Sequence, residues 1–352
     1  MQRQLRCLIA AGGTAGHVLP ALAIARALNE RGVHVTFAGS PDRVEARLVP
    51  EAGFELDTFR ITGLPRRPSV ALARALLLAG SAPVACARIL RKRRPDVVLG
   101  AGGFVAGPMV FAASRMRIPT ALTEADAHLG LANRLAAPFA RRLFLAYPIA
   151  TRYGRKTKVV GRPLPQSTAV SQADAREIFE LPADGPVLGV FGALAGATAL
   201  NEFVVETWAA SGPAILHQTG LRDYELVKRR VRRPDYRVIP ETDRFAAALT
   251  ACDLILSRAG SSVWEIAAAG RPAILVPYPF ATGDHQAENA RHFELAGGAI
   301  MVREQELGRV PELVRSLLGD PERRAAMAAA MLAAARPNAA AEIADELVAM
   351  AS

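Results

Sequence analysis

Two stretches of the sequence share one pattern, and this repeat is the strongest constraint on the fold. CLIAAGGTAGHVLPALAIA begins at Cys7, and PVLGVFGALAGATALNEFV begins at Pro186. Each contains an apolar run that predicts a buried strand, then a glycine-rich loop, then an apolar pattern with helical spacing. A strand, a loop and a helix in this order begin a β-α-β unit, so the repeat predicts an α/β protein with two Rossmann-like, doubly wound domains. The length of 352 residues also fits two domains better than one.

The cysteines and the apolar runs indicate a cellular compartment. Cys7, Cys86 and Cys252 stand singly in apolar runs, and this spacing indicates neither a disulfide framework nor a metal cluster. Residues 1–13 read as a strand that ends in glycines and not as a signal peptide. The longest uncharged run, residues 97–114, is interrupted by glycines and is shorter than the ~20 apolar residues of a membrane span. We therefore expect a cytoplasmic protein.

The charge is distributed unevenly along the chain. The net charge is +10, and residues 1–160 contain 24 Lys and Arg but 9 Asp and Glu, whereas the remainder is net acidic. Such an asymmetry predicts an anionic partner for the first half, either nucleic acid or a membrane surface. Aromatic residues are few and no nucleic-acid motif is recognisable, so we expect an anionic membrane surface and no nucleic acid.

Residues 61–94 combine this basic charge with apolar side chains. The residues concerned are Leu76, Leu77, Leu78 and Val84, interleaved with Arg66, Arg67 and Arg74 and followed by a basic cluster at residues 91–94. One interpretation is two ordinary packed helices with a solvated basic end. The other is a contact in the plane of a membrane, in which leucines enter the interface and arginines meet anionic head groups. The sequence leaves both interpretations open.

Residues 254–270 hold a candidate phosphate and ribose site. They read as a strand, a tight loop at Gly260 and a helix, and a loop that leads into a helix N-terminus favours anions. Ser261 and Ser262 add hydroxyl donors, and Glu265 could accept hydrogen bonds from ribose hydroxyls. The alternative is that Ser262-x-x-Glu265 is a capping box.

Residues 271–289 favour the binding site over the cap. A second buried strand is followed by Asp284-x-Gln286-x-x-Asn289, whose polar side chains begin another helix beside the first.

The first glycine loop, GGTAGH at residues 12–17, holds the candidate base. Its spacing is not the G-x-G-x-x-G of dinucleotide sites. His17 would lie in the first turn of a helix, where the helix dipole disfavours the imidazolium, so the ring should stay neutral and able to accept a proton. A histidine at this place could also merely cap the loop.

These motifs together resemble a known family. SRAG at 257–260, EIAAAG at 265–270 and D-x-Q-x-x-N at 284–289 resemble the UDP-sugar site of GT-B glycosyltransferases, and most closely that of the MurG family of peptidoglycan synthesis. The first loop resembles the family's amino-terminal loop, with Ala15 where glycine is usual. AGGFVAGP at 101–108 and HQTG at 217–220 also match, so the resemblance spans nearly the whole chain.

The resemblance implies a domain plan and a reaction. Residues 1–162, joined by a C-terminal helix at 335–352, would form the acceptor and membrane-side domain, and residues 163–334 would bind UDP-N-acetylglucosamine. The reaction would be an inverting transfer of N-acetylglucosamine to the muramoyl C4 hydroxyl of lipid I, which gives lipid II. It would take place at the cytoplasmic face of the cell membrane, on a peripheral protein that needs neither a metal nor another cofactor.

The resemblance also implies roles for single residues. His17 is the candidate catalytic base, with Glu124 or Asp126 as its alternative or as an orienting partner. The residues expected to bind substrate are Thr14, Ala15, Gly16, Gly102, Gly103, Asp126, Asn133, Arg162, Gly192, Leu194, Gly196, Thr242, Gly260, Ser261, Ser262, Glu265, Gln286 and Asn289.

Departures from the family pattern keep a rival interpretation open. Thr123 replaces a histidine, Asp126 an asparagine, Pro165 an arginine and Leu194 a serine. A catalytically silent sugar-nucleotide-binding paralogue would tolerate these changes, and so would a related transferase with another lipid-linked acceptor. An NAD-dependent dehydrogenase is a distant third, because the chain lacks a complete dinucleotide fingerprint.

Overall fold

The computed structural model describes residues 3–63, 69–165, 170–192 and 197–351, without the side chains of residues 71–76 and 282. The chain divides into two compact units, of which the first comprises Met1–Gln166 with Pro337–Ser352 and the second Ser167–Arg336. The sequence-based boundaries, after residues 162 and 334, lie slightly before these points.

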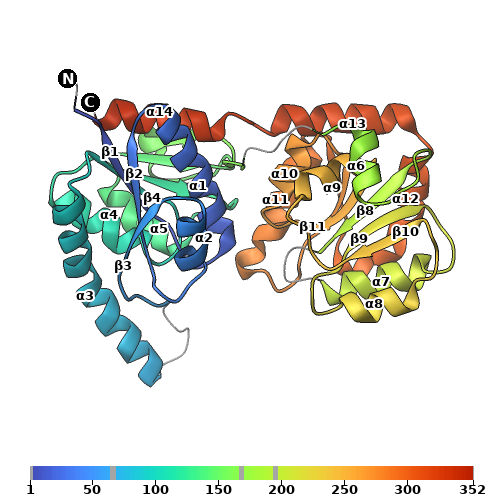
Figure 1. Ribbon diagram of the computed structural model, residues 1–352, viewed down its shortest axis with the longest axis horizontal. Coiled ribbons are helices and arrows are strands. Elements are labelled where there is room, and N and C mark those ends of the chain that lie inside the picture. The colour runs from blue at the N-terminus through green and yellow to red at the C-terminus, as the bar shows by residue number, and fades with distance from the viewer. Residues whose placement is uncertain (1–2, 64–68, 166–169, 193–196, 352) are drawn as a thin grey trace. The chain divides into compact units, whose positions relative to one another are not determined.

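The first unit contains a seven-stranded parallel sheet in the order β3-β2-β1-β4-β5-β6-β7 (Figure 1). The strands are β1 (Arg6–Ala10), β2 (His34–Gly39), β3 (Glu55–Thr58), β4 (Val97–Gly100), β5 (Thr120–Glu124), β6 (Arg142–Leu145) and β7 (Thr157–Val159). Alternate residues of β1 face opposite sides of the sheet. Cys7 and Ile9 enter one apolar core, whereas Leu8 and Ala10 enter the other.

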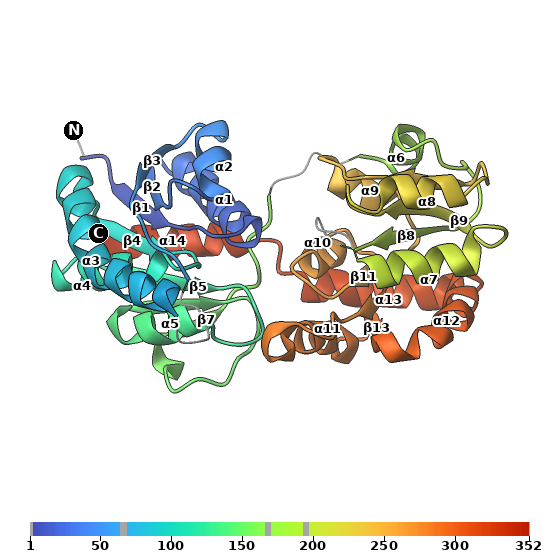
Figure 2. The same cartoon turned by 90° about the horizontal axis from the view of Figure 1, so that it is seen from below.

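Helices cover both faces of this sheet. They are α1 (Ala15–Glu30), α2 (Glu45–Glu51), α3 (Val70–Arg93), α4 (Ala106–Arg115), α5 (Leu131–Ala136) and α14 (Ala339–Ala351), with short 3-10 turns η1 (Ala137–Phe139) and η2 (Gly154–Lys156). The last helix of the chain, α14, lies beside α1 and buries Ile343 and Leu347 in the core that contains Ile9 (Figure 2). The C-terminus therefore completes the first unit.

Helix α3 differs from one sequence-based interpretation. Residues 70–93 form a single helix, so the prediction of two packed helices is wrong. Cys86 and Leu90, in its second half, are buried against α4, whereas Val70, Leu77 and Val84 are exposed. Arg66, Arg67 and the side chains of Arg74 and Leu76 lie outside the described residues. No helix in the described ranges is both long and apolar enough to cross a membrane.

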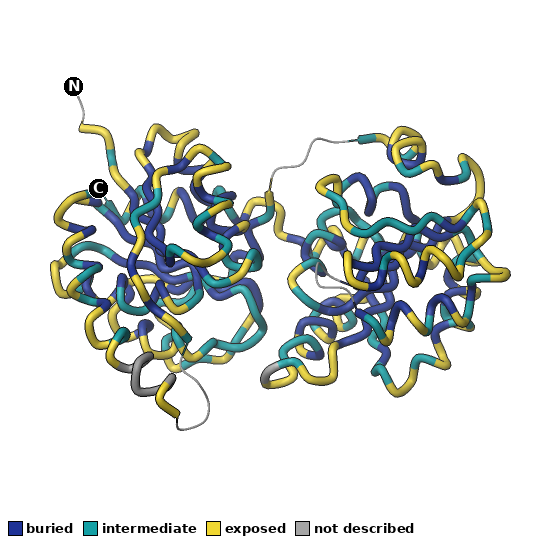
Figure 3. Tube along the Cα trace, turned by 60° about the horizontal axis from the view of Figure 1, so that its bottom comes forward, coloured by how far each residue is buried: buried dark blue, intermediate teal, exposed yellow. Residues whose placement is uncertain are grey.

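The second unit repeats the plan with a six-stranded parallel sheet in the order β10-β9-β8-β11-β12-β13. The strands are β8 (Val187–Phe191), β9 (Ala214–Gln218), β10 (Tyr236–Ile239), β11 (Leu254–Arg258), β12 (Ala273–Val276) and β13 (Ala299–Met301). The helices are α6 (Gln172–Ile178), α7 (Thr198–Trp208), α8 (Tyr224–Arg230), α9 (Phe245–Ala251), α10 (Val263–Ala268), α11 (His285–Leu295), α12 (Val310–Leu318) and α13 (Pro321–Ala334), with the 3-10 turns η3 (Thr282–Asp284) and η4 (Glu304–Arg309). In both units the inner strands of the sheet are largely buried, whereas the edge strands β3, β7, β10 and β13 are mostly partly buried or exposed, as are many residues of the helices and loops (Figure 3).

Both sheets have the same break in strand order. In the first unit the chain moves from β1 outward to β3 and then resumes at β4 on the other side of β1. In the second unit it moves from β8 to β10 and resumes at β11 beside β8. Ligands of open parallel sheets bind at such a switch point, beyond the carboxyl ends of the strands. The two Rossmann-like domains predicted from the repeat are thus confirmed, and each has one expected ligand position.

Candidate functional site

The first glycine loop lies at the switch point of the first unit. β1 ends at Ala10 and α1 begins at Ala15, and Gly13 has a φ of +92°, which favours glycine. The carbonyl of Thr14 accepts hydrogen bonds from the N–H groups of His17 at 3.1 Å and Val18 at 3.2 Å. His17 therefore lies in the first turn of α1, with Ala15 and Gly16 just before it.

The second glycine loop, between β4 and α4, packs directly on the first. Gly102 and Gly103 have φ values of +97° and +75°. A methyl group on Gly102 would overlap the ring of His17, and one on Gly103 would overlap the carbonyl oxygen of Gly12. The structure thus brings Gly102, Gly103 and His17 together, and it does so because neither loop residue has a side chain.

The first loop also has an anchor that the sequence analysis missed. Glu45, the first residue of α2, is fully buried, and its carboxylate accepts hydrogen bonds from the N–H groups of Gly13 at 3.0 Å and Ser40 at 2.9 Å. An acidic residue shortly after the second strand of a β-α-β unit is a recognisable signal. In a dinucleotide site such a residue binds ribose, whereas here it binds backbone.

The surroundings of His17 keep its imidazole neutral. Burial is the largest cause and lowers the pKa of His17 below its ordinary value, and the positive charge of Arg162 lowers it further. The charges of Asp126 and Glu124 and a hydrogen bond with the Gly12 backbone oppose this shift. The expected neutrality is therefore supported, but desolvation replaces the helix dipole as its main cause. Thr14 Oγ1 lies 3.2 Å from Nδ1 of the ring.

Glu124, at the end of β5, is fully engaged with its own loop. Oε1 accepts hydrogen bonds from the N–H groups of Ala125 at 3.0 Å and Asp126 at 3.2 Å. Oε2 accepts from the N–H of Gly130 at 2.8 Å and from Nδ2 of Asn133 at 2.9 Å. Four donors to one carboxylate leave little capacity to take a further proton. This geometry favours the orienting role over the base.

Asn133 and Arg162 also contact the framework of the first unit. Asn133 is buried and donates a second hydrogen bond from Nδ2 to the carbonyl of Thr123 at 2.9 Å. Arg162 is buried and donates from Nη2 to the carbonyl of Gly16 at 2.6 Å. Both side chains therefore shape the site through the backbone. Asp126 is only partly buried and acts electrostatically on His17, so it stays next to the candidate base.

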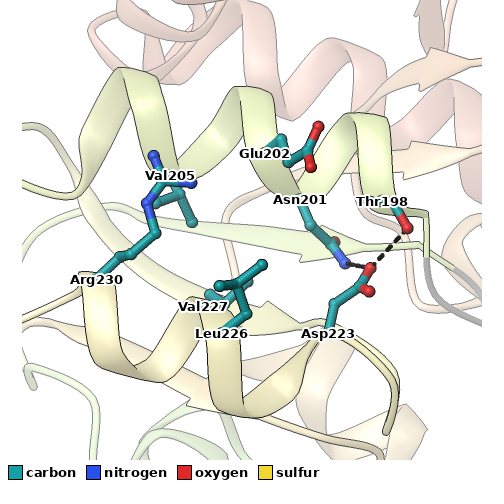
Figure 4. Close-up of a pocket in the computed structure, with 8 residues that line it drawn as sticks. All are labelled: Thr198, Asn201, Glu202, Val205, Asp223, Leu226, Val227 and Arg230. Atoms are coloured by element: carbon teal, nitrogen blue, oxygen red, sulfur yellow. Dashed lines mark hydrogen bonds between the residues drawn. The ribbon is translucent and has the colours of Figure 1, made fainter.

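The β8–α7 loop of the second unit is only partly described. Gly192 directly follows β8 and is buried, whereas Leu194 and Gly196 lie outside the described residues. At the start of α7, Thr198 Oγ1 and Asn201 Nδ2 each donate to Oδ2 of Asp223 at 2.9 Å, and these groups line a small cavity of about 10 Å³ (Figure 4). That volume is at the lower limit for one water molecule. The cavity is therefore no ligand site.

His217 of the HQTG segment is a second neutral histidine, with a structural role. Its Nε2 lies 3.0 Å from Oδ1 of Asn201, and its Nδ1 lies 2.9 Å from the hydroxyl of Tyr236. Complete burial lowers the pKa of His217 to about 3. Asn201 also donates to the carbonyl of Thr219 at 2.9 Å. This network fixes the end of β9 to the first turns of α7.

A larger cavity, of about 560 Å³, lies at the amino-terminal ends of the strands of the second sheet. Its lining includes Pro186 and Pro213, which directly precede β8 and β9, together with Trp208. These residues mark the amino ends of the strands. The ligand position expected from the topology is at the opposite, carboxyl ends.

The β11–α10 loop carries Gly260, Ser261 and Ser262 at the switch point of the second unit. Ser262 precedes α10 with φ −63° and ψ −15°, a helical conformation, and its hydroxyl makes no capping hydrogen bond. The capping-box alternative, which needs that hydrogen bond, is therefore wrong, and Glu265 lies on the first turn of α10. α10 has six residues, so any attraction for phosphate depends on loop N–H groups and hydroxyls more than on a long helix dipole.

The start of α11 lies against this loop. Asn289 is buried and donates from Nδ2 to the carbonyl of Ala259 at 3.2 Å. Gln286 Oε1 accepts from the N–H of Tyr278 at 2.9 Å, and its Nε2 would lie 3.8 Å from a methyl group on Gly260. The structure thus brings Gly260, Gln286 and Asn289 together, with Asn289 holding the loop and the amide nitrogen of Gln286 directed towards it.

Two further residues frame the second site. Thr242, between β10 and α9, accepts a hydrogen bond at Oγ1 from the N–H of Arg244 at 3.0 Å. Arg258 of the SRAG segment, which the sequence analysis did not single out, is buried and pairs with Glu304. Its Nη1 lies 3.4 Å from the carbonyl of Pro277. It therefore connects the end of β11 to the segment that leads to α11.

The described part of the chain contains no group of three His, Cys, Asp or Glu residues that could hold a metal ion.

Comparisons with known proteins agree over both units. The glycosyltransferase family 28 N-terminal domain matches residues 7–145, and the glycosyltransferase family 28 C-terminal domain matches residues 187–346. The crystal structure of Acinetobacter baumannii MurG superposes with a TM-score of 0.79 at 26% identity, covering 99% of this chain and 100% of that chain.

Two relatives carry the same name, UDP-N-acetylglucosamine--N-acetylmuramyl-(pentapeptide) pyrophosphoryl-undecaprenol N-acetylglucosamine transferase. The one from Acidithiobacillus ferrooxidans (strain ATCC 53993 / BNL-5-31) is 44% identical over 350 residues, which cover 96% of this chain and 95% of the relative. The one from Halothermothrix orenii is 36% identical over 345 residues, which cover 92% and 93%. The chain therefore belongs to the MurG family of N-acetylglucosamine transferases, within glycosyltransferase family 28.

Proposed function

We propose that this chain transfers N-acetylglucosamine from UDP-N-acetylglucosamine to the muramoyl C4 hydroxyl of lipid I and so makes lipid II for peptidoglycan synthesis. The observation that carries the proposal is the presence of a glycine loop at the switch point of each parallel sheet, in a chain whose relatives bear this name over nine tenths of its length. One ligand position in each unit suits one donor and one acceptor.

The second unit is assigned the donor. The N–H groups of residues 259–262 and the hydroxyls of Ser261 and Ser262 would hold the diphosphate. Glu265, on the first turn of α10, would accept hydrogen bonds from the ribose. Gln286 would donate to the sugar, and Gly192 and the Thr242 loop would border the phosphate and the uracil.

The first unit is assigned the acceptor and the base. Thr14, Ala15, Gly16, Gly102 and Gly103 would border the acceptor diphosphate, because their loops expose backbone with few side chains. The acceptor hydroxyl oxygen attacks the anomeric carbon from the face opposite UDP. The bond from that carbon to the phosphate oxygen breaks, and UDP leaves with the electron pair. The hydroxyl proton passes to the neutral ring of His17, which Thr14 orients.

Asp126 is the alternative base. It lies close enough to His17 to raise the pKa of that histidine, and it is only partly buried. Glu124 is the less suitable carboxylate because four donors occupy it. Asp126 can also accept hydrogen bonds from a sugar, but it cannot donate them as the family's asparagine can.

A silent sugar-nucleotide binder is the second candidate. The observation in its favour is the set of departures at Thr123, Asp126, Pro165 and Leu194. Arg162 is the arginine nearest in sequence before Pro165, but its guanidinium is buried and bonded to the carbonyl of Gly16, so it does not take over the charge that Pro165 lacks.

The first unit also offers a surface for an anionic membrane, at which the chain would act as a peripheral protein on the cytoplasmic face. Val70 and Leu77 are 88% and 76% exposed on α3, and Val84 follows on the same helix. Arg91 and Arg94 are exposed at its end, whereas Lys92 and Arg93 pair with Asp57. The basic cluster is thus partly neutralised, and leucine and valine contacts would add to the attraction of the remaining arginines for lipid head groups.

Turnover tests the proposed function directly. Purified chain incubated with radiolabelled UDP-N-acetylglucosamine and a lipid I analogue should release UDP and form a labelled disaccharide product. Binding of UDP-N-acetylglucosamine without turnover on any lipid-linked acceptor would establish the silent binder instead.

His17→Ala tests the base. General-base catalysis contributes ~10²–10⁴-fold, so kcat should fall by that order while the Kd for UDP, set by the second unit, changes little. A base must be unprotonated, and burial lowers the pKa of His17. The wild-type rate should therefore fall only as the pH drops below the ordinary histidine value of 6.5, and this acidic limb should vanish or move in the variant. Retained turnover in His17→Ala with collapse in Asp126→Ala would assign the base to the carboxylate.

Vesicle sedimentation tests the membrane surface. Binding to vesicles with anionic lipid should weaken steeply as salt rises, because the Debye length is ~10 Å at 0.1 M. Leu77→Asp combined with Val84→Asp should weaken it further, whereas Leu226→Asp combined with Leu295→Asp, at exposed positions of the second unit, should not. Vesicle binding that changes neither with salt nor in the Leu77→Asp and Val84→Asp variant would refute the assignment of a membrane surface to α3.

A further inference from the structure

The fully buried carboxylate of Glu45 is the starting point. It lies at the first position of α2, and each of its oxygens accepts one backbone hydrogen bond. Oε2 accepts from Gly13 at 3.0 Å and Oε1 from Ser40 at 2.9 Å. No Lys, Arg or His side chain of the described ranges forms an ion pair with it. A buried carboxylate without a cation is costly, so these two N–H groups are its main compensation.

The backbone leaves space for this carboxylate only because two neighbours are glycines. A methyl group on Gly12 would overlap Oε1 of Glu45, and one on Gly39 would lie 2.6 Å from its Cγ. Gly39 ends β2, and Gly12 lies in the loop after β1. The side chain therefore fits closely between the ends of two adjacent parallel strands and fixes the height of the first glycine loop above the sheet.

The same loop supports the candidate base through close contacts. The carbonyl oxygen of Gly12 lies where a side chain of Gly103 would stand, and the ring of His17 lies where a side chain of Gly102 would stand. A shift of residues 12–13 would thus displace the second glycine loop. Because Gly102 of that loop lies against the ring of His17, the shift would also change the surroundings of the histidine. The contacts between the two loops leave no free space, so a movement of one loop moves the other.

We propose that Glu45 is a positioning residue for the transfer reaction, which holds the residue 12–13 backbone so that His17 stays in register with the acceptor hydroxyl. The inference rests on the proposed function. Glu45 itself touches neither substrate nor the reacting atoms. It acts through the backbone, and its effect should appear in kcat and leave donor binding unchanged.

The chemistry explains why glutamate is required. A carboxylate offers an acceptor to both N–H groups, whereas the amide of glutamine offers one acceptor and turns a donor towards the other N–H. Aspartate keeps both acceptors but is one methylene shorter, so it cannot meet both donors without movement of the loop. Glu45→Gln and Glu45→Asp therefore disturb the anchor by different routes.

The first measurement is the kinetics of Glu45→Gln. Misplacement of a reacting group by ~1 Å costs ~10²-fold, so kcat should fall by about 10-fold to 100-fold while the Kd for UDP-N-acetylglucosamine stays within about twofold. Glu51→Gln is the matched control, since Glu51 lies on the same helix with an exposed side chain and should leave kcat unchanged. A Glu45→Gln variant with wild-type kcat would overturn the inference.

A double-mutant cycle separates positioning from general damage. If Glu45 acts through His17, Glu45→Gln should cause at most a twofold further loss in a His17→Ala background. A loss that is as large in that background as in wild type would overturn the inference. Hydrogen exchange at β1 amides shows whether the first unit remains folded, and Glu45→Asp is used in the same cycle if the glutamine variant unfolds.

Failure of the inference is distinguishable from failure of the proposed function. A wild-type chain without turnover contradicts the function, and with it the role of Glu45. A wild-type chain that turns over, with Glu45 variants that are folded and unimpaired, contradicts the role of Glu45 alone.

Discussion

The close contact between the two glycine loops of the first unit, at residues 12–13 and 102–103, is the constraint on which the first site depends. The carbonyl of Gly12 occupies the space that a side chain at Gly103 would need, and the ring of His17 occupies the space beside Gly102. Parallel strands bring both loops to the same edge of the sheet, and the break in strand order places them next to each other. Any side chain larger than hydrogen at these positions would separate the loops and remove the candidate base from its place.

Most of these buried charged and titratable groups hold the backbone in place and take no direct part in the proposed reaction. Glu45 and Glu124 are both buried carboxylates, and both accept backbone N–H groups at loops that border the site. His217 is neutral and bonded on both ring nitrogens. The pKa of His17 is lowered as well, but this histidine lies in the first turn of α1 and its side chain is only partly buried. The environment of a residue, and not its type, separates the anchor from the candidate base.

The sequence predicts the two-domain α/β fold because glycine loops between apolar runs report strands, turns and helix starts directly. The sequence predicts less well those features that depend on contacts between residues far apart in the chain. Gly80 and Pro83 are common helix breakers, yet α3 continues through them while Cys86 and Leu90 pack against α4. The capping box failed because the backbone of Ser262 is helical. Glu45 was missed because its partner Gly13 lies 32 residues away in the sequence.

The central proposal is that the ligand position of the second unit binds the donor and that of the first unit binds the acceptor. Hydrogen–deuterium exchange with and without saturating UDP measures this most directly. The account predicts slower exchange at the amides of residues 259–265 and 285–289 and unchanged exchange at residues 11–17. Protection confined to residues 11–17 and 101–105, with none in the second unit, would contradict it.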